Sequence, residues 1–316
     1  MRFSPSHVAL AALLLPATLM AQSRSFLPRT TTFPSSTRAM ALGDSYVLTA
    51  GHSDVIFYHP ARVTDARGFG ADLQSWGTDG ASAASAAAFS GSFEGFGGAW
   101  GIGIRVLQFG VPSDGGAGGG VPQAPIGQDH HFVSGGDPVS ERTATIAFGR
   151  ELFGGISLGV AMDLVDARFG ASQDNAMLFD AGLSTDVGPV GVALTAHDMG
   201  SKPFGDFGTG PSRVVLGAGA YGEQVGILDV GFAANAGIDA DDQFTFGAGV
   251  EIGYYPIQGR TFVARLGMQD VPDGSSVSPV TAGFAFWADN LSLEWAFRPL
   301  GDSLGTGTHR FGVRWR

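Results

Sequence analysis

The stretch from Ile156 to Leu164 reads ISLGVAMDL, and its side chains alternate in character without a fault. Large apolar residues occupy every second position, and small or acidic residues lie between them. Successive side chains of a β-strand point to opposite faces, so this period of two predicts a strand with one apolar and one small, polar face. The same alternation recurs at Phe244–Ile252, Leu291–Arg298 and Arg310–Trp315.

The alternation continues from Arg67 to the C-terminus and predicts an all-β fold. About fourteen strands fit, each near the ~9–11 residues that a tilted membrane strand needs. We expect them at 67–76, 83–93, 98–109, 141–150, 155–166, 175–185, 189–198, 212–222, 225–236, 242–253, 260–269, 279–288, 290–298 and 307–316. Their connections alternate between short and long, which is typical of a transmembrane antiparallel β-barrel with short periplasmic turns. An even strand number places both mature termini in the periplasm.

The composition also favours a barrel in the bacterial outer membrane. Hydrophobic residues make up 44% of the chain and charged residues 15%, which is low against the usual ~25%. No run reaches the ~18 apolar residues of a membrane helix. The absence of Cys excludes disulfides and thiolate metal sites. The net charge of −11 argues against a nucleic-acid partner and leaves membrane lipid as the expected surroundings.

The N-terminal residues divide into an export signal and a segment that precedes the barrel. Residues 1–21 have a weakly positive start, an apolar core and an A-x-A-like site before Gln22, which predicts a secretory signal peptide. Residues 22–66 form a lead and a compact segment, and residues 67–316 form the barrel. Within the compact segment, apolar residues between Ala39 and Leu48 have helix-like spacing. Asp54 is expected to cap a short turn that Pro60 ends.

Two pieces of the compact segment carry a family resemblance. Residues 38–47 read RAMALGDSYV, and residues 53–61 read SDVIFYHPA. They resemble the opening of the PorV/PorQ group, within the FadL-type outer-membrane transporter superfamily, although His59 stands where that group has Asn. The resemblance implies that the N-terminal segment folds inside the barrel as a hatch. The matching residues are Arg38, Ala39, Met40, Gly43, Asp44, Tyr46, Asp54, Phe57, His59, Pro60 and Ala61.

Three functions stay open, the first two of which the resemblance implies. The first is the passage of hydrophobic or amphipathic small molecules through a hatch-gated lumen. The second is a PorV-like anchor or partner of a type IX protein secretion system, which would use the external loops 110–140 and 199–211. The third, a lipid-acting enzyme, is suggested by the pair His197-Asp198, but no nucleophile can be placed beside it from sequence. We therefore predict that the protein is not an enzyme.

The strand faces opposite the apolar residues should line the lumen. Their charged members are expected to form a polar pathway or a set of contacts to the hatch, or simply to pair with one another because buried charge must be paired. They are Arg105, Asp163, Asp180, His197, Asp229, Glu251, Arg265, Glu294, Arg298, Arg310 and Arg314. Most other lumen positions hold small residues, which leave room for the hatch. His130-His131 lies in a loop without enough fixed ligands for a metal, and no cofactor is expected.

Overall fold

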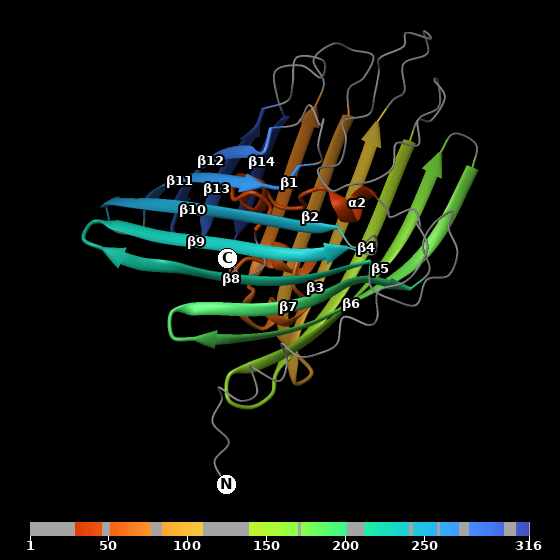
Figure 1. The fold of residues 1–316 in the computed structure, drawn as a ribbon, viewed down its shortest axis with the longest axis horizontal. Helices are drawn as coiled ribbons and strands as arrows, with labels where there is room; N and C mark the ends of the chain where they lie inside the picture. The colour runs from red at the N-terminus through yellow and green to blue at the C-terminus, as the bar shows by residue number, and fades with distance from the viewer. Residues whose placement is uncertain are drawn as a thin grey trace.

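Fourteen antiparallel strands close into a barrel, which confirms the predicted fold class and strand number (Figure 1). The structure is a computed structural model that describes residues 29–45, 51–76, 84–109, 139–169, 172–200, 212–239, 243–257, 260–271, 278–299 and 308–315. The strands are β1 (Gly68–Trp76), β2 (Ala84–Gly95), β3 (Gly98–Phe109), β4 (Val139–Glu151), β5 (Ile156–Phe169), β6 (Ser172–Val187), β7 (Val190–Gly200), β8 (Arg213–Val225), β9 (Leu228–Asp239), β10 (Phe244–Ile257), β11 (Arg260–Gln269), β12 (Val280–Ala288), β13 (Leu291–Arg298) and β14 (Thr308–Trp315). Within these ranges, no helix has the length and apolarity to span a bilayer.

Each strand pairs with its neighbours in sequence, and the first strand closes the barrel against the last. The closure runs from Phe69 opposite Trp315 to Ser75 opposite His309. Both the start of β1 and the end of β14 therefore lie at the end of the barrel that carries the short turns, such as the β2–β3 turn.

The alternation in sequence becomes a difference between the two faces of the wall. On β5, Leu158, Val160 and Leu164 are 42–49% exposed on the outer face. Ala161 and Asp163, on the inner face, are 4% exposed. An apolar exterior and a small or polar interior are the pattern of a barrel solvated by lipid.

Several strands are longer than the sequence predicts. Residues 167–174 were expected to form a loop, yet β5 continues to Phe169 and β6 begins at Ser172, with Arg168 opposite Gln173. Likewise, β10 runs through the expected turn after Tyr255 to Ile257. The reason is that backbone hydrogen bonds extend a hairpin whether or not its side chains are apolar.

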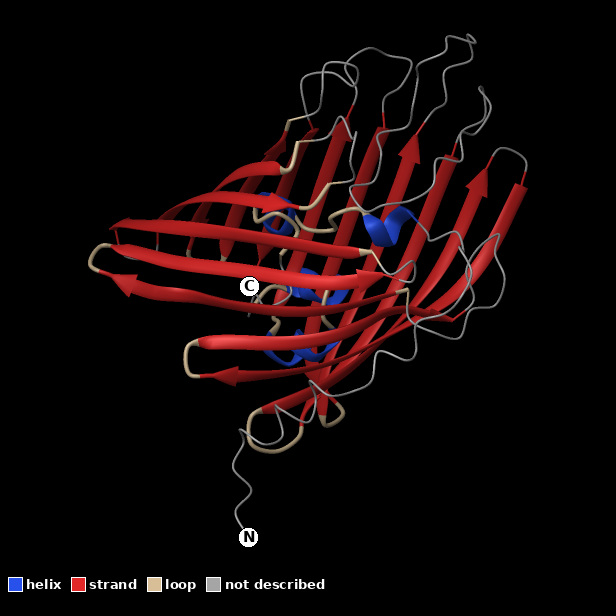
Figure 2. Ribbon diagram, in the orientation of Figure 1, coloured by secondary structure: helices blue, strands red, loops and turns tan. Residues whose placement is uncertain are grey.

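The N-terminal segment lies inside the barrel, where Figure 2 shows its short helices enclosed by the strands. We call residues 29–45 and 51–66 the hatch. It contains α2 (Arg29–Thr32), α3 (Thr37–Ala41) and the 3₁₀-helices η1 (Ser53–Phe57) and η2 (Pro60–Asp65). Residues 1–28, which include the predicted signal peptide, and Tyr46 lie outside the described residues.

The local structure of the hatch differs from two predictions. The helix expected between Ala39 and Leu48 ends at Ala41, because Gly43 and Asp44 take left-handed conformations with φ of 67° and 57°. Asp54 does not cap η1: it lies within that helix, and its carboxylate accepts a 2.6 Å hydrogen bond from Arg314. Pro60 begins η2, where its missing N–H costs no helical hydrogen bond.

The closed barrel gives a simple expected result on a gel. Unheated protein in SDS should migrate differently from boiled protein, because a closed hydrogen-bonded barrel resists the detergent until it is heated. The protein is extracted in mild detergent and the two samples are run side by side. Identical migration, together with solubility in the absence of detergent, would contradict the membrane barrel.

Candidate functional site

Glycines in the barrel wall bring the hatch backbone into direct contact with the strands. A Cβ atom added at Gly159 would lie 2.2 Å from the backbone nitrogen of Ala61. One added at Gly267 would lie 2.1 Å from the backbone nitrogen of Gly43. Such distances are far below any van der Waals contact, so at these positions the hatch occupies the space that a side chain would fill.

These glycines form two groups on opposite walls. Gly101, Gly103, Gly149, Gly159, Gly182 and Gly191, on β3–β7, face hatch residues between Ile56 and Arg62. Gly247, Gly249, Gly267, Gly283 and Gly312, on β10–β14, face residues Thr37–Gly43. At these positions, the small lumen residues leave room for the hatch. The hatch has two halves, residues 29–45 and residues 51–66, and each half contacts a different wall of the barrel.

The half that follows Ser53 is also held by apolar packing. Val55, Ile56, Phe57 and Val63 are buried and cluster with alanines of β2–β5, namely Ala88, Ala99, Ala147 and Ala161. Alternating small wall residues with large hatch residues fills the lumen in the way that a protein core is filled.

Arg314 joins the hatch to the wall through three buried carboxylates. Its guanidinium lies 2.6 Å from Asp54 of the hatch and 2.9 Å from Asp72 of β1. Glu294 of β13 lies 3.8 Å away. The same Asp72 accepts hydrogen bonds of 2.7 and 2.6 Å from the backbone N–H and the hydroxyl of Thr37. Both halves of the hatch thus depend on one cluster of charges.

A second chain of ion pairs starts at Arg38, the first residue of the family motif. Arg38 pairs with Glu251 of β10, which also accepts from Arg265 at 3.1 Å. Arg265 forms a further ion pair with Glu294 of β13, at 3.3 Å. Arg38 also lies over the ring of Trp287, with its Cζ 5.7 Å from the centroid. The charged residues here pair with one another and with Arg38 of the hatch.

The start of the described hatch is fixed in the half of the lumen away from the short turns, which we call the outer half. The Thr30 N–H donates to Glu141 over 2.9 Å, near the outer end of β4. Arg105 donates to the Thr30 carbonyl at 3.2 Å and pairs with Asp163 at 2.7 Å. The last hatch residues lie at the short-turn end, where the following Arg67 pairs with Glu94 of β2.

The other predicted lumen residues contact the wall. Asp229 accepts from Tyr255 at 2.8 Å, Arg310 donates to Gln74 at 2.5 Å and Arg298 donates to the Ser278 carbonyl at 2.9 Å. His197 lies 3.1 Å from Asp180, and Asp198 has a φ of 55°. His197 and Asp198 together face Asp180 alone, so they form a β-bulge in β7.

Three residues of the site were not singled out from the sequence. Asp72 alternates with Gly70 and Gln74 on β1, so the period of two contained the signal. Tyr58 accepts hydrogen bonds from the backbone of Ser35 and Ser36 and ties the two halves of the hatch together, which no pattern indicated. The third is Trp287, which faces Arg38 in the lumen.

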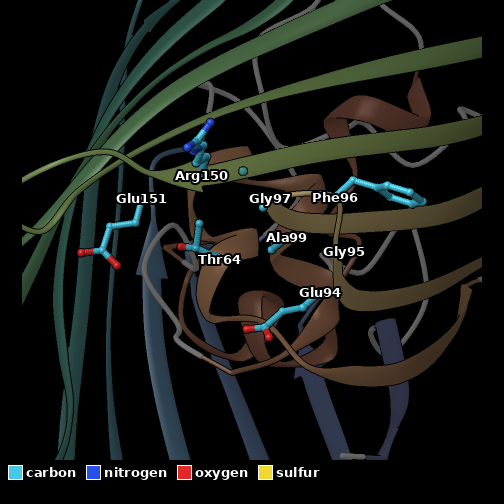
Figure 3. A pocket seen from close by; sticks show the side chains of 10 residues that line it. Thr64, Glu94, Gly95, Phe96, Gly97, Ala99, Arg150 and Glu151 are labelled. Carbon is cyan, nitrogen blue, oxygen red and sulfur yellow. The ribbon is translucent and has the colours of Figure 1, made fainter.

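A cavity of about 430 Å³ lies at the short-turn end of the hatch. Figure 3 shows Thr64 of the hatch among residues of the β2–β3 turn and the β4–β5 end, with the Phe96 ring pointing away from the others. The lining residues are Thr64, Glu94, Gly95, Phe96, Gly97, Gly98, Ala99, Gly149, Arg150 and Glu151.

A second, smaller cavity lies at the outer ends of β8–β11. Hatch residues Gly43 and Asp44 line it together with Arg213, Val215, Asn235, Gly237, Thr245, Phe246, Gln269 and Asp270. Burial raises the pKa of the Asp44 carboxyl to about 6, against the opposing attraction of nearby arginines. Asp44 belongs to the hatch and not to a spanning strand.

His59, the departure from the family motif, is fully buried beside Gly182 of β6. Burial lowers the pKa of its ring to about 3, so the imidazole is neutral and packs as an uncharged group. Among the described residues, no three His, Asp or Glu side chains are arranged to hold a metal ion.

Solved structures share this architecture at low sequence identity. The Pseudomonas putida toluene transporter TodX has 11% identity and a TM-score of 0.55, covering 87% of this chain and 95% of its own. The Ralstonia pickettii toluene transporter TbuX has 10% identity and a TM-score of 0.54, covering 89% and 98%. A Pseudomonas aeruginosa FadL homologue has 11% identity and a TM-score of 0.51, covering 90% and 98%. No family model and no curated protein matches the sequence.

The chain therefore has the fold of FadL-type outer-membrane barrels, which confirms the broader part of the predicted resemblance at the level of architecture. The similar structures are described as transporters, and their likeness to this chain is one of fold. The narrower assignment to the PorV/PorQ group stays a prediction.

Proposed function

We propose that this protein passes hydrophobic or amphipathic small molecules across the outer membrane, and that the hatch gates the lumen. The observation that carries the proposal is that hatch residues line both cavities, Asp44 at the outer end and Thr64 at the short-turn end. A solute that travels between them must pass the hatch. The toluene transporters with the same fold support a hydrophobic solute.

The gate works by displacement of the hatch from its glycine seats. The hatch is held by close backbone contacts at Gly159 and Gly267 and by ion pairs to Arg314 and Glu251. A solute that separates one half from its wall opens a path while the other half stays attached. The predicted export signal in residues 1–21 and the periplasmic N-terminus belong to the same proposal.

Deleting residues 38–60 should raise the conductance of the pore in planar bilayers, because this change removes most of the material that fills the lumen. The conductance of single channels is compared with that of the full-length protein, after the gel shift has shown that both are folded. Proteoliposomes of the two proteins are also tested for uptake of a labelled aromatic hydrocarbon. Unchanged conductance and uptake would contradict a hatch that closes the lumen.

The secretion-system alternative depends on loops 110–140 and 199–211, and residues 110–138 and 201–211 lie outside the described residues. The uptake experiment separates the two functions, because an anchor for a secretion partner would show no hatch-dependent uptake. For the enzymatic alternative, the bulge gives His197 and Asp198 a role in the shape of β7, and we propose no reaction for them.

A further inference from the structure

The outer cavity contains two buried oxygen atoms that lack a hydrogen-bond partner. One is Oδ1 of Asp44 and the other is Oε1 of Gln269, whose side chain is 5% exposed. Both residues line the cavity. Buried polar atoms in native proteins are nearly always paired, so two unpaired acceptors at one cavity indicate an occupant that donates hydrogen bonds.

Both backbone polar groups of Asp44 are hydrogen-bonded, which fixes the position from which its carboxylate extends. Its N–H donates to the Ala39 carbonyl at 2.8 Å, and its own carbonyl accepts from Asn235 at 2.9 Å. The preceding Gly43 donates to the Thr281 hydroxyl at 3.2 Å. Asp44 is therefore presented by the hatch to the wall in one defined position.

The size and charge of the cavity select a small, uncharged head group. Its volume of about 40 Å³ holds only a few water-sized groups, since ~10–15 Å³ of such space holds one water molecule. Arg213 lines the same cavity and partly offsets the charge of Asp44, so the buried carboxylate needs only a neutral donor there, while the second carboxylate of the lining, Asp270, is exposed. A hydroxyl fits both conditions, and Val215 provides apolar surface beside it.

We propose that the outer cavity binds the hydroxyl end of an amphipathic molecule, an alcohol or a phenol, before it passes the hatch. The hydroxyl donates to Asp44, and an accompanying water or a second hydroxyl donates to Gln269. This inference rests on the proposed transport function and narrows its substrates from hydrophobic or amphipathic molecules in general to those with a hydrogen-bond donor at one end. Because Asp44 is part of the hatch, occupancy of the cavity acts directly on the gate.

The test compares 4-fluorophenol with fluorobenzene, which differ only in the hydroxyl, on the full-length protein in lipid nanodiscs. Binding is measured by ¹⁹F NMR titration. The native protein should prefer the phenol, and Asp44→Asn should weaken phenol binding about tenfold while fluorobenzene changes less than about twofold. Asn tolerates the left-handed conformation at this position, so the variant keeps the backbone. Gln269→Met should weaken phenol binding by about fivefold, and Gln269→Glu should preserve it.

Asp289→Asn is the matched control, because Asp289 also has a positive φ, of 48°, but lies in the β12–β13 turn. It should leave both ligands unchanged. Equal binding of phenol and fluorobenzene by the native protein would mean that the cavity holds an ordered water only, and would overturn the proposal. An equal loss of both ligands in Asp44→Asn would overturn it as well. Selective binding of the phenol without uptake into proteoliposomes would contradict the proposed transport function but support the proposed binding site.

Discussion

Replacing Gly159 or Gly267 with Ala should displace one half of the hatch and open the pore, although each change adds a single methyl group. The new Cβ would meet backbone atoms of Ala61 or Gly43 at 2.2 and 2.1 Å, and backbone cannot move aside as a flexible side chain can. Overpacking of this kind costs about 1–3 kcal/mol, which is comparable with the free energy that seats a short segment. We expect higher single-channel conductance for both variants.

Gly253→Ala is the matched control for these variants. Gly253 also faces the lumen, but its added Cβ would meet only wall atoms, the nearest being the Thr261 methyl at 3.2 Å. Its conductance should equal that of the native protein. Hydrogen exchange should show lost protection near Ala61 in Gly159→Ala and near Leu42 in Gly267→Ala. If all three variants behave alike, the glycines do not act as seats for the hatch.

Arg314→Met should destabilise the hatch more than any single neutral change, because three carboxylates would lose their shared cation. Asp54, Asp72 and Glu294 all face Arg314, whose side chain is 3% exposed. Breaking a buried ion pair by removing one partner costs about 3–5 kcal/mol, since the remaining charge is left without compensation. Guanidinium titration of the protein in lipid vesicles, followed by hydrogen exchange at Ser53–Phe57, measures the loss.

Arg67→Met is the control for Arg314→Met, since Arg67 pairs with Glu94 at the surface, where the two side chains are 44% and 69% exposed. This pair should contribute less than about 1 kcal/mol. Adding Asp54→Asn to Arg314→Met should restore part of the lost protection, because the double variant leaves fewer unpaired charges. Equal effects of Arg314→Met and Arg67→Met would contradict a hatch anchored by buried charge.

The sequence by itself determined the barrel. Strand alternation at positions such as Ile156–Leu164 is a local property, because the polarity of each side chain indicates the face of the strand on which it lies. In a membrane barrel the apolar face contacts lipid. About fourteen strands and the inward position of Arg105 or Glu251 follow from that period, and the alternation of short and long connections indicates a barrel. The ends of β5 and β10 did not follow, because backbone pairing continues where side-chain patterning has stopped.

Only the tertiary structure decided how the hatch is held. Gly159 and Gly267 lie far from Ala61 and Gly43 in sequence, and nothing local distinguishes a glycine that seats a hatch from one that bends a strand. The role of Asp54 likewise depends on Arg314 at the other end of the chain, whereas its local context suggested a helix cap. A periodic pattern records which face a residue takes, but contacts between distant segments depend on the closed barrel that brings them together.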